Sequence, residues 1–440
     1  MVVGILALSV GALLILGVAI WVVRRRIAGA GEPVVDPEPP VEDSVPLPQP
    51  QQPTHDTEVS PDVPTLSVVA LGLIGAGKSV LLGSQARELR PAAGRRYHLD
   101  CDLEQHRVLA QLHGQVRDTQ APWPLATRPG DAREFLFECK ATDGVHRQRT
   151  VFRIDYFDYP GDELEPGART GSSSELESRV ARAHALLVML DGQRVLALLD
   201  GDDAVHDEFE DQVWPMIALA HRAQCPVQLI ITKWDLVRSF GAPTDDDELL
   251  RKVWTQLERH PVIKQLVRAH CQRDEEVRLI PVSAVGSRFA ELRADGTVAK
   301  RADGVLEPVN VDVPLCAVIP DLLRRVEQSL DPSVRQQLHD EIDRVPVGDV
   351  SAMAQSVLSS RVGALVRNAL AVLVGDFVVT WFVETLVRSR WGRAPLPSVG
   401  DGEAETLRLR LEVIDDMEEV VDDFEDRLRG SVLCRRPRSR

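Results

Sequence analysis

The stretch from Gly72 to Ser79 reads Gly-Leu-Ile-Gly-Ala-Gly-Lys-Ser and follows a short apolar run. Glycines let the backbone approach phosphate oxygens with its N–H groups pointing inward, and a helix that begins after Gly77 adds the positive end of its dipole. The Lys78 ammonium would meet the outer phosphates, and the Ser79 hydroxyl would be a ligand of Mg²⁺. The phosphate-binding residues predicted from this pattern are Gly72, Gly75, Ala76, Gly77, Lys78, Ser79 and Val80.

A second motif, Asp158-Tyr159-Pro160-Gly161, also follows an apolar run. At the end of a strand, the Asp158 carboxylate can hold the shell of Mg²⁺ through water, and the Gly161 N–H can sense the third phosphate. Taken alone, a solvated turn explains these residues equally well. Their position after the phosphate-binding stretch favours catalytic roles for Lys78, Asp158 and Gly161, with Asp158 also serving the metal.

Two further motifs, Thr232-Lys233-Trp234-Asp235 and Ser283-Ala284-Val285, select the base. Guanine presents two adjacent donors, the ring N1–H and the exocyclic amine, and the carboxylate of Asp235 can accept from both, whereas adenine has no such pair. The Lys233 side chain can lie over the base, and the Ala284 N–H can meet the guanine carbonyl. We therefore predict a site for GTP or GDP with Mg²⁺, whose base-binding residues are Thr232, Lys233, Asp235, Ser283, Ala284 and Val285.

The elements that must position these motifs alternate between strand-like and helical patterns from residue 65 to about residue 330. This alternation predicts an α/β fold, a three-layer sandwich with a mostly parallel sheet. Asp143-Gly144 indicates a hairpin between the second and third strands, and Asp295-Gly296 a second hairpin. The expected strands are Thr65–Leu71, Glu134–Lys140, Thr150–Phe157, Ala185–Leu190, Val227–Ile231 and Val277–Val282.

Together the four motifs resemble those of the P-loop GTPase superfamily, over residues 65–330. The resemblance is to the TRAFAC class with its small Ras-like and translation-factor-like proteins, and suggests a membrane-anchored, bacterial-type member. It implies the P-loop NTPase fold and hydrolysis of GTP to GDP and phosphate. An anchored helix before such a domain is also similar to the membrane subunit of the signal-recognition-particle receptor, although the C-terminal helices here have no counterpart there.

Two positions depart from the family pattern. Family members close a threonine over Mg²⁺ just before the second strand, and Thr127 fits that place as a metal and catalytic residue, although 48 positions separate it from Ser79. Thr119 is the alternative, and an ordinary loop threonine remains open. Asp162 stands where many members carry a glutamine that orients the attacking water. Because an ionised Asp only accepts hydrogen bonds, we expect slow intrinsic hydrolysis.

The N-terminal region predicts attachment to a membrane. Residues 2–23 carry no charge and would span about 33 Å as a helix, enough for a bilayer core. Three arginines, residues 24–26, follow at once, which places the N-terminus outside and the rest of the chain in the cytoplasm. A cleaved or buried helix is the alternative. Residues 27–64 are rich in proline and acidic residues and should form a disordered tether.

Residues 331–440 are predicted to form an α-helical C-terminal region that contacts a protein partner or a second copy. Asp331-Pro332 is a helix start, and one long helix is expected from Ser351 to Arg390. Its apolar part, residues 365–387, carries a polar residue at every fourth position from Asp376, so we expect it to pack on protein rather than cross the membrane. A last helix, Glu403–Gly430, carries one apolar stripe.

Composition excludes some partners. The net charge of −16 argues against nucleic acid, because a phosphate backbone rewards clustered Lys and Arg. The six cysteines show no paired spacing and are expected to be reduced thiols. The sequence thus predicts a membrane-anchored cytoplasmic GTPase that works as a molecular switch. The rival hypothesis is a GTP-binding scaffold that hardly hydrolyses its nucleotide.

Overall fold

The computed structural model describes residues 63–92, 95–125, 132–143, 146–164, 173–199, 201, 203–240, 245–273, 275–346, 348–390 and 402–433. The predicted membrane helix, the tether as far as residue 62 and Thr127 lie outside these residues. All described residues belong to one compact unit, residues 59–440. Within the described part, no helix combines the length and the apolar character that crossing a bilayer requires.

One seven-stranded sheet, in the order β2-β3-β4-β1-β5-β6-β7, forms the centre of the fold. β4, β1, β5, β6 and β7 run parallel, whereas β2 and β3 pair antiparallel at one edge. The predicted mostly parallel α/β sheet and both predicted hairpins are confirmed. The strands are β1 (Thr65–Gly72), β2 (Tyr97–Asp100), β3 (Arg133–Thr142), β4 (Gln148–Asp158), β5 (Ala185–Leu190), β6 (Val227–Ile231), β7 (Val277–Pro281), and the separate hairpin β8 (Ala290–Leu292) and β9 (Val298–Lys300).

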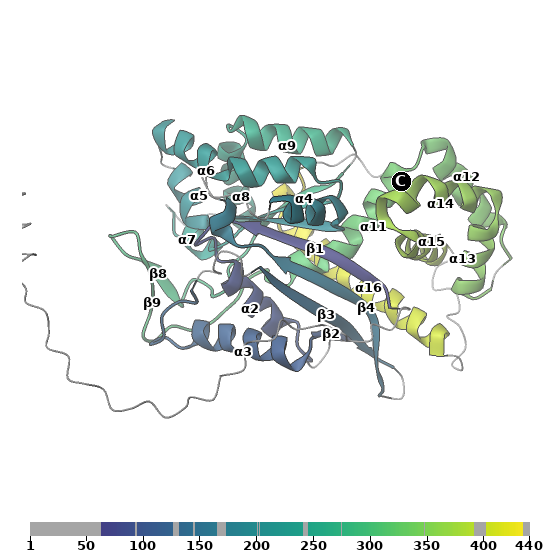
Figure 1. Cartoon of the computed structure of the whole chain (residues 1–440), viewed down its shortest axis with the longest axis horizontal. Helices are drawn as coiled ribbons and strands as arrows, with labels where there is room; N and C mark the ends of the chain where they lie inside the picture. Colours follow the sequence, from purple (N-terminus) through teal and green to yellow (C-terminus); the bar gives the residue numbers. More distant parts are fainter. Residues whose placement is uncertain are drawn as a thin grey trace, which may run out of the picture. The chain divides into compact units, whose positions relative to one another are not determined.

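Helices cover both faces of the sheet, as Figure 1 shows with α9 above it and α3 below it. α4, α6 and α9 pack on β1, β5 and β7, respectively. β5, β6 and β7 are buried throughout, as expected for parallel strands between two helical layers. The helices of this part are α2 (Lys78–Glu88), α3 (Leu103–Arg117), η1 (Gly161–Leu164), α4 (Ser173–Arg182), α5 (Gly192–Leu199), α6 (Asp203–Arg222), α7 (Trp234–Arg238), α8 (Asp246–Leu257), α9 (Pro261–Gln272), α10 (Val313–Cys316) and α11 (Val318–Ser329).

The last helix, α16 (Gly402–Arg427), belongs to the cover of the sheet. It packs on β3 and β4 beside α10 and α11, and after the short η2 (Arg429–Ser431) the chain forms an isolated β-bridge between Val432 and Arg278 of β7. The predicted apolar stripe is therefore buried within the chain itself. Its buried members are Leu407, Leu411, Ile414, Met417, Val421, Phe424 and Leu428.

The long helix predicted from Ser351 to Arg390 is wrong, because the segment forms α13 (Val350–Ser359), α14 (Arg361–Val374) and α15 (Asp376–Arg390). The second break falls at Gly375, whose φ of 81° suits glycine. With α12 (Pro332–Arg344), these helices form a bundle that contacts α11. α15 packs its apolar side on protein, as predicted, with Trp381 5.9 Å from Phe152 of β4 between ring centroids.

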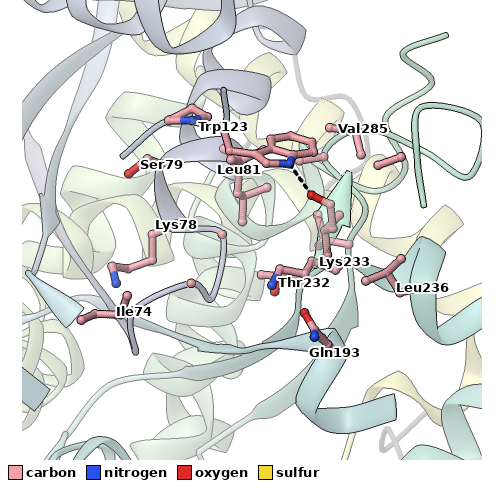
Figure 2. A pocket seen from close by; sticks show the side chains of 18 of the residues that line it. Ile74, Lys78, Ser79, Leu81, Trp123, Gln193, Thr232, Lys233, Leu236 and Val285 are labelled. Carbon is pink, nitrogen blue, oxygen red and sulfur yellow. Dashed lines mark hydrogen bonds between the residues drawn. The ribbon is translucent and has the colours of Figure 1, made fainter. Parts of the chain in front are cut away.

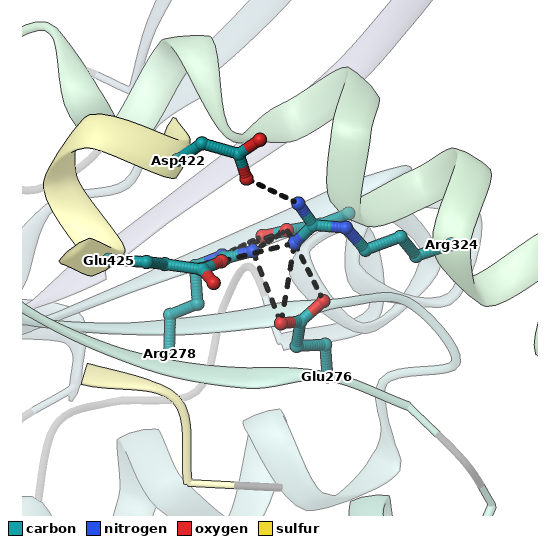
Figure 3. Close-up of polar contacts among 6 residues, drawn as sticks. Glu276, Arg278, Arg324, Asp422 and Glu425 are labelled. Carbon is teal, nitrogen blue, oxygen red and sulfur yellow. Dashed lines mark hydrogen bonds and ion pairs between the residues drawn. The ribbon is translucent and has the colours of Figure 1, made fainter. Parts of the chain in front are cut away.

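A buried ionic cluster ties α16 to the sheet (Figure 3). The guanidinium of Arg278, on β7, is fully buried and contacts the carboxylates of Asp321 on α11, Glu425 on α16 and Glu276. Arg324 adds a second guanidinium, 3.3 Å from both Glu276 and Glu425. Removing one charged side chain from such a cluster is strongly destabilising, because the remaining charges stay buried without their full set of partners.

The cysteines differ from the predicted reduced state at one position. Cys101, Cys139, Cys225 and Cys316 are free thiols, and the last three are buried. Cys271, in contrast, is disulfide-bonded. The expectation of six reduced thiols is therefore wrong for Cys271.

Candidate nucleotide-binding site

All four predicted motifs lie at the carboxyl ends of the parallel strands β1, β4, β6 and β7, which meet at one edge of the sheet. A cavity of about 560 Å³ opens there (Figure 2). Ligand sites in parallel α/β sheets lie at this edge, because the loops that leave neighbouring strands converge there. The predicted residues that line the cavity are Gly75, Gly77, Lys78, Ser79, Val80, Gly161, Thr232, Lys233, Asp235, Ala284 and Val285.

The phosphate loop connects β1, which ends at Gly72, to α2, which begins at Lys78. Gly75 and Gly77 have φ values of 78° and 82°, a left-handed conformation that side chains with a Cβ rarely adopt. The Lys78 ammonium donates to the carbonyl oxygens of Gly72 and Leu73, so it is held directly beside the loop. Gly72 and Ala76 shape this turn without lining the cavity.

Gly161 packs directly on the phosphate loop. A Cβ on Gly161 would lie 2.6 Å from the backbone nitrogen of Ile74 and 2.6 Å from the carbonyl carbon of Leu73. No side chain fits at that distance. The backbone at Gly161 therefore lies directly against the phosphate loop.

Asp158 ends β4 and is almost completely buried. Neither of its carboxylate oxygens has a hydrogen-bond partner among the described residues. Burial raises the pKa of Asp158 to about 6, although the nearby Lys78 and Arg133 lower it. An unsatisfied buried carboxylate is costly, and a cation or a water bound to a cation would satisfy it.

Mg²⁺ fits these residues. Ser79 lines the cavity next to Lys78, and the Asp158 carboxylate lacks any other partner in the described structure. The described part of the chain holds no group of three His, Cys, Asp or Glu side chains suited to a metal. The remaining ligands of Mg²⁺ would accordingly be phosphate oxygens and water, which this ion prefers.

Thr127 and the side chain of Asp162 lie outside the described residues. Thr119, the alternative to Thr127, donates from Oγ1 to the carbonyl oxygen of Ala302, 3.4 Å away, and does not line the cavity. The contacts of Thr119 thus give no support to the alternative.

The two base motifs meet around Asp235. Ser283 donates from Oγ to Oδ1 of Asp235 over 2.5 Å, and the Gly286 N–H donates to the same Ser283 oxygen over 2.8 Å. Burial raises the pKa of Asp235, whereas the bond from Ser283 lowers it. Lys233 has a φ of 49° and pairs with Asp191, 2.9 Å from its ammonium. Ser283 itself does not line the cavity but orients the carboxylate that does.

Sequence reasoning missed several residues at the cavity. Gln193 closely follows β5. Because the carboxyl ends of parallel strands meet at one sheet edge, the position of Gln193 in the sequence could have predicted that it lies near the cavity. Gly192, just before it, allows α5 to approach β6, because a Cβ there would lie 2.0 Å from the carbonyl oxygen of Thr232. No comparable signal marked the others. The additional lining residues are Leu73, Ile74, Leu81, Trp123, Pro124, Leu125, Gln193, Leu236, Val282, Ala290, Thr297 and Val298.

Comparison with known proteins gives no assignment by sequence. No protein-family model matches the chain, and no curated protein matches it. Solved structures give matches of low similarity, and the assignment of the site consequently depends on the residues described above. The SRβ–GTP/SRX signal-recognition-particle receptor complex from Chaetomium thermophilum is 18% identical over 50% of this chain and 91% of that chain, with a TM-score of 0.29.

Two other matches cover less than half of the matched chains. The GTPase-like domain of Ski7 from S. cerevisiae, bound to GTP, is 15% identical over 56% of this chain and 48% of that chain, with a TM-score of 0.30. Sup35 complexed with GMPPNP is 16% identical over 52% of this chain and 40% of that chain, with a TM-score of 0.26.

Proposed function

We propose that this chain binds GTP and hydrolyses it slowly to GDP and phosphate, and that it works as a membrane-anchored molecular switch. The observation that carries the proposal is the shared cavity. Its walls contain Lys78 and Ser79 of the phosphate loop together with Asp235 and Ala284 of the base motifs. A guanosine triphosphate needs these two kinds of group at opposite ends of one site.

At the phosphate end, the loop supplies inward-pointing backbone N–H groups and the start of α2. The Lys78 ammonium, which now contacts the Gly72 and Leu73 carbonyl oxygens, is close enough to exchange them for phosphate oxygens. Mg²⁺, when bound, would neutralise charge on the phosphates, and Ser79 and Asp158 are the residues that would hold it.

At the base end, the carboxylate of Asp235 accepts from the two guanine donors, with its orientation held by Ser283. Lys233 lines the cavity, and its ammonium donates to the carboxylate of Asp191. Because adenine lacks the matching donors, we expect a strong preference for guanine over adenine nucleotides.

The rate of hydrolysis separates the proposed switch from the alternative, a GTP-binding scaffold. Asp162 cannot donate a hydrogen bond when ionised, so we expect slow single-turnover hydrolysis that Asp162→Gln raises, or at least does not abolish. Lys78→Ala should remove tight binding, whereas Lys264→Ala, a surface lysine paired with Glu258, should not. GTP binding without any hydrolysis, even at high protein concentration, would favour the scaffold.

The membrane anchor is a separate part of the proposal, supported by the uncharged residues 2–23 and the arginines that follow them. Deleting residues 1–26 should release the protein from membranes to the soluble fraction while GTP binding stays intact. A truncated protein that still sediments with membranes would contradict an anchor confined to the N-terminus.

A further inference from the structure

The β8–β9 hairpin is inserted directly after the base motif Ser283-Ala284-Val285 and forms a two-stranded sheet of its own. Figure 1 shows it standing out from the body of the fold. An isolated two-stranded hairpin is marginally stable in water, so its position depends on what holds it. Yet Ala290, Thr297 and Val298 line the nucleotide cavity. A specific set of contacts must therefore keep these residues in place.

One side of the hairpin is held by Gln193, at the start of α5. Its Nε2 donates to the carbonyl oxygen of Gly296, in the hairpin turn, over 2.7 Å. The Gln193 backbone N–H donates to Oδ1 of Asp191, the residue that also pairs with Lys233 of the base motif. Gln193 consequently links the turn of the hairpin to the residues predicted to bind guanine.

The other side is held by Trp123, in the segment after α3. Its indole Nε1 donates to the carbonyl oxygen of Val298 over 2.8 Å, the bond drawn in Figure 2. The ring also packs edge-on against Phe289, with 6.2 Å between centroids. A small apolar cluster separate from the main core surrounds this contact; it contains Val116, Val285, Phe289 and Ala290, with Trp123 and Val298 packed against it.

A third set of contacts holds the last residue of the hairpin, Lys300, which does not line the cavity. The Lys300 ammonium donates to the carbonyl oxygens of Gln115, Asp118 and Ala121, at and just beyond the end of α3. It also lies 4.8 Å from the Trp123 ring centroid. A cation is favoured at the carboxyl end of a helix. Lys300 does not line the cavity, so it acts on the site only through the hairpin.

We propose that the β8–β9 hairpin is a strap that retains the bound guanine nucleotide, with Gln193 and Trp123 as its two clasps and Lys300 as a positioning residue. This inference rests on the proposed function of the cavity. Because Ala290, Thr297 and Val298 form part of the cavity wall, movement of the hairpin away from the cavity would widen the exit for a nucleotide, and each clasp opposes that movement. The strap should therefore slow dissociation of both GDP and GTP.

The test measures the dissociation rate of a fluorescent GDP analogue, preloaded on the full-length protein and chased with excess GDP. Trp123→Phe keeps an aromatic ring but loses the indole N–H, and Gln193→Ala loses the amide. Each should speed release about five-fold, the value of one ordinary hydrogen bond. The double variant should speed release about twenty-five-fold, because opening the strap breaks both contacts.

Lys300→Met distinguishes the strap from direct contact with the nucleotide, because Lys300 lies outside the cavity wall. It should also speed release by at least five-fold. Trp214→Phe, Gln212→Ala and Lys264→Met make the same chemical changes on exposed helix surfaces and should leave the rate unchanged. Unchanged thermal unfolding of the nucleotide-free variants would show that their folds are intact.

The outcomes separate this inference from the proposed function. If the wild-type protein fails to bind the GDP analogue, the proposed function is wrong. If it binds the analogue but Trp123→Phe, Gln193→Ala and Lys300→Met all release it at the wild-type rate, the strap is wrong and the nucleotide site stands. Faster release in the first two variants with no change in Lys300→Met would likewise overturn the strap, in favour of direct nucleotide contacts.

Discussion

Ser283 and Asp235 are joined by a hydrogen bond of 2.5 Å from the serine Oγ to the aspartate Oδ1, which brings the motif after β7 onto the motif after β6. The two residues are 48 positions apart, and both are buried. The carboxylate is thus fixed in orientation before any ligand arrives. Preorganisation of this kind lowers the entropy that recognition costs.

The first prediction is that Asp235→Asn exchanges guanine for xanthine. The Asn amide would face the exocyclic amine of guanine, leaving two donors opposed at a cost of about 1–3 kcal/mol for each unsatisfied group. Xanthine carries a carbonyl oxygen at that position and should bind better. Affinities for GTP, xanthosine triphosphate and ATP, measured for wild type and variant, check the expectation.

Asp349→Asn is a matched control for this exchange, because Asp349 caps α13 and asparagine caps helices equally well. It should leave all three affinities unchanged. Undiminished GTP binding in Asp235→Asn, or wild-type affinity for ATP equal to that for GTP, would contradict the assignment of Asp235 to the base.

The second prediction concerns Mg²⁺. Asp158→Asn removes the charge of a buried carboxylate that has no partner in the described structure. If Asp158 orients the metal through water, the variant should lose roughly ten- to a hundred-fold in metal affinity, as outer-shell changes do. GTP affinity measured with Mg²⁺ and with a chelator should differ strongly for wild type and much less for Asp158→Asn.

The sequence predicted the motifs well because each phosphate or base contact needs a particular residue type beside a strand end. Gly75 and Gly77 do adopt the left-handed backbone that the phosphate loop requires, and all six strands predicted from apolar runs match within two residues. β2 was missed, since it has only four residues, Tyr97–Asp100, and lies at the sheet edge. Short edge strands carry little periodicity to recognise.

Long-range packing was harder to predict. The stripe on α16 has the right period for a buried face, but period alone does not say whether the partner is another molecule or the chain's own sheet. The break at Gly375 was also missed, because a lone glycine inside an apolar helical pattern is often tolerated. The hairpin contacts of Trp123 and Gln193 depend on residues more than 100 positions apart, which no local pattern encodes.

The third prediction tests the cluster in Figure 3. Arg278→Met should lower the free energy of unfolding by about 3–5 kcal/mol, because it leaves the carboxylates of Asp321, Glu276 and Glu425 buried with one less cation. Urea denaturation of the two proteins measures the difference. Arg222→Met, which removes an exposed pair with Glu177, should cost about 0–1 kcal/mol.

The fourth prediction is that residues 65–330 do not fold stably without α16. Removing the chain from residue 402 onward would expose the apolar surfaces of β3 and β4 on which α16 packs, and it would remove Glu425 from the cluster around Arg278. The truncated protein should show reduced ellipticity and bind a dye for exposed apolar surface. A truncated protein that melts like the full chain and still binds GTP would contradict this dependence.

The last prediction concerns Glu384, on α15, whose Oε2 is buried without a hydrogen-bond partner in the described structure. Burial raises the pKa of Glu384 to about 7, although Arg410 of α16 lowers it. A raised pKa means that the folded state binds the proton more tightly than the unfolded state. The resulting stabilisation is complete below the unfolded pKa of about 4.5 and is lost as pH rises through about 7.

The Gln side chain in Glu384→Gln cannot ionise, so the variant escapes the stability loss of the wild type. The free energy of unfolding of the variant minus that of the wild type should therefore rise by about 2–3 kcal/mol from pH 5 to pH 8. Urea denaturation at the two pH values measures this change, with Glu177→Gln, which alters an exposed carboxyl paired with Arg222, as the control variant. If Glu384→Gln instead becomes less stable than wild type at pH 8, the ionised carboxylate is stabilised by Arg410. The contact between α15 and α16 would then act as an ion pair rather than as a buried neutral acid.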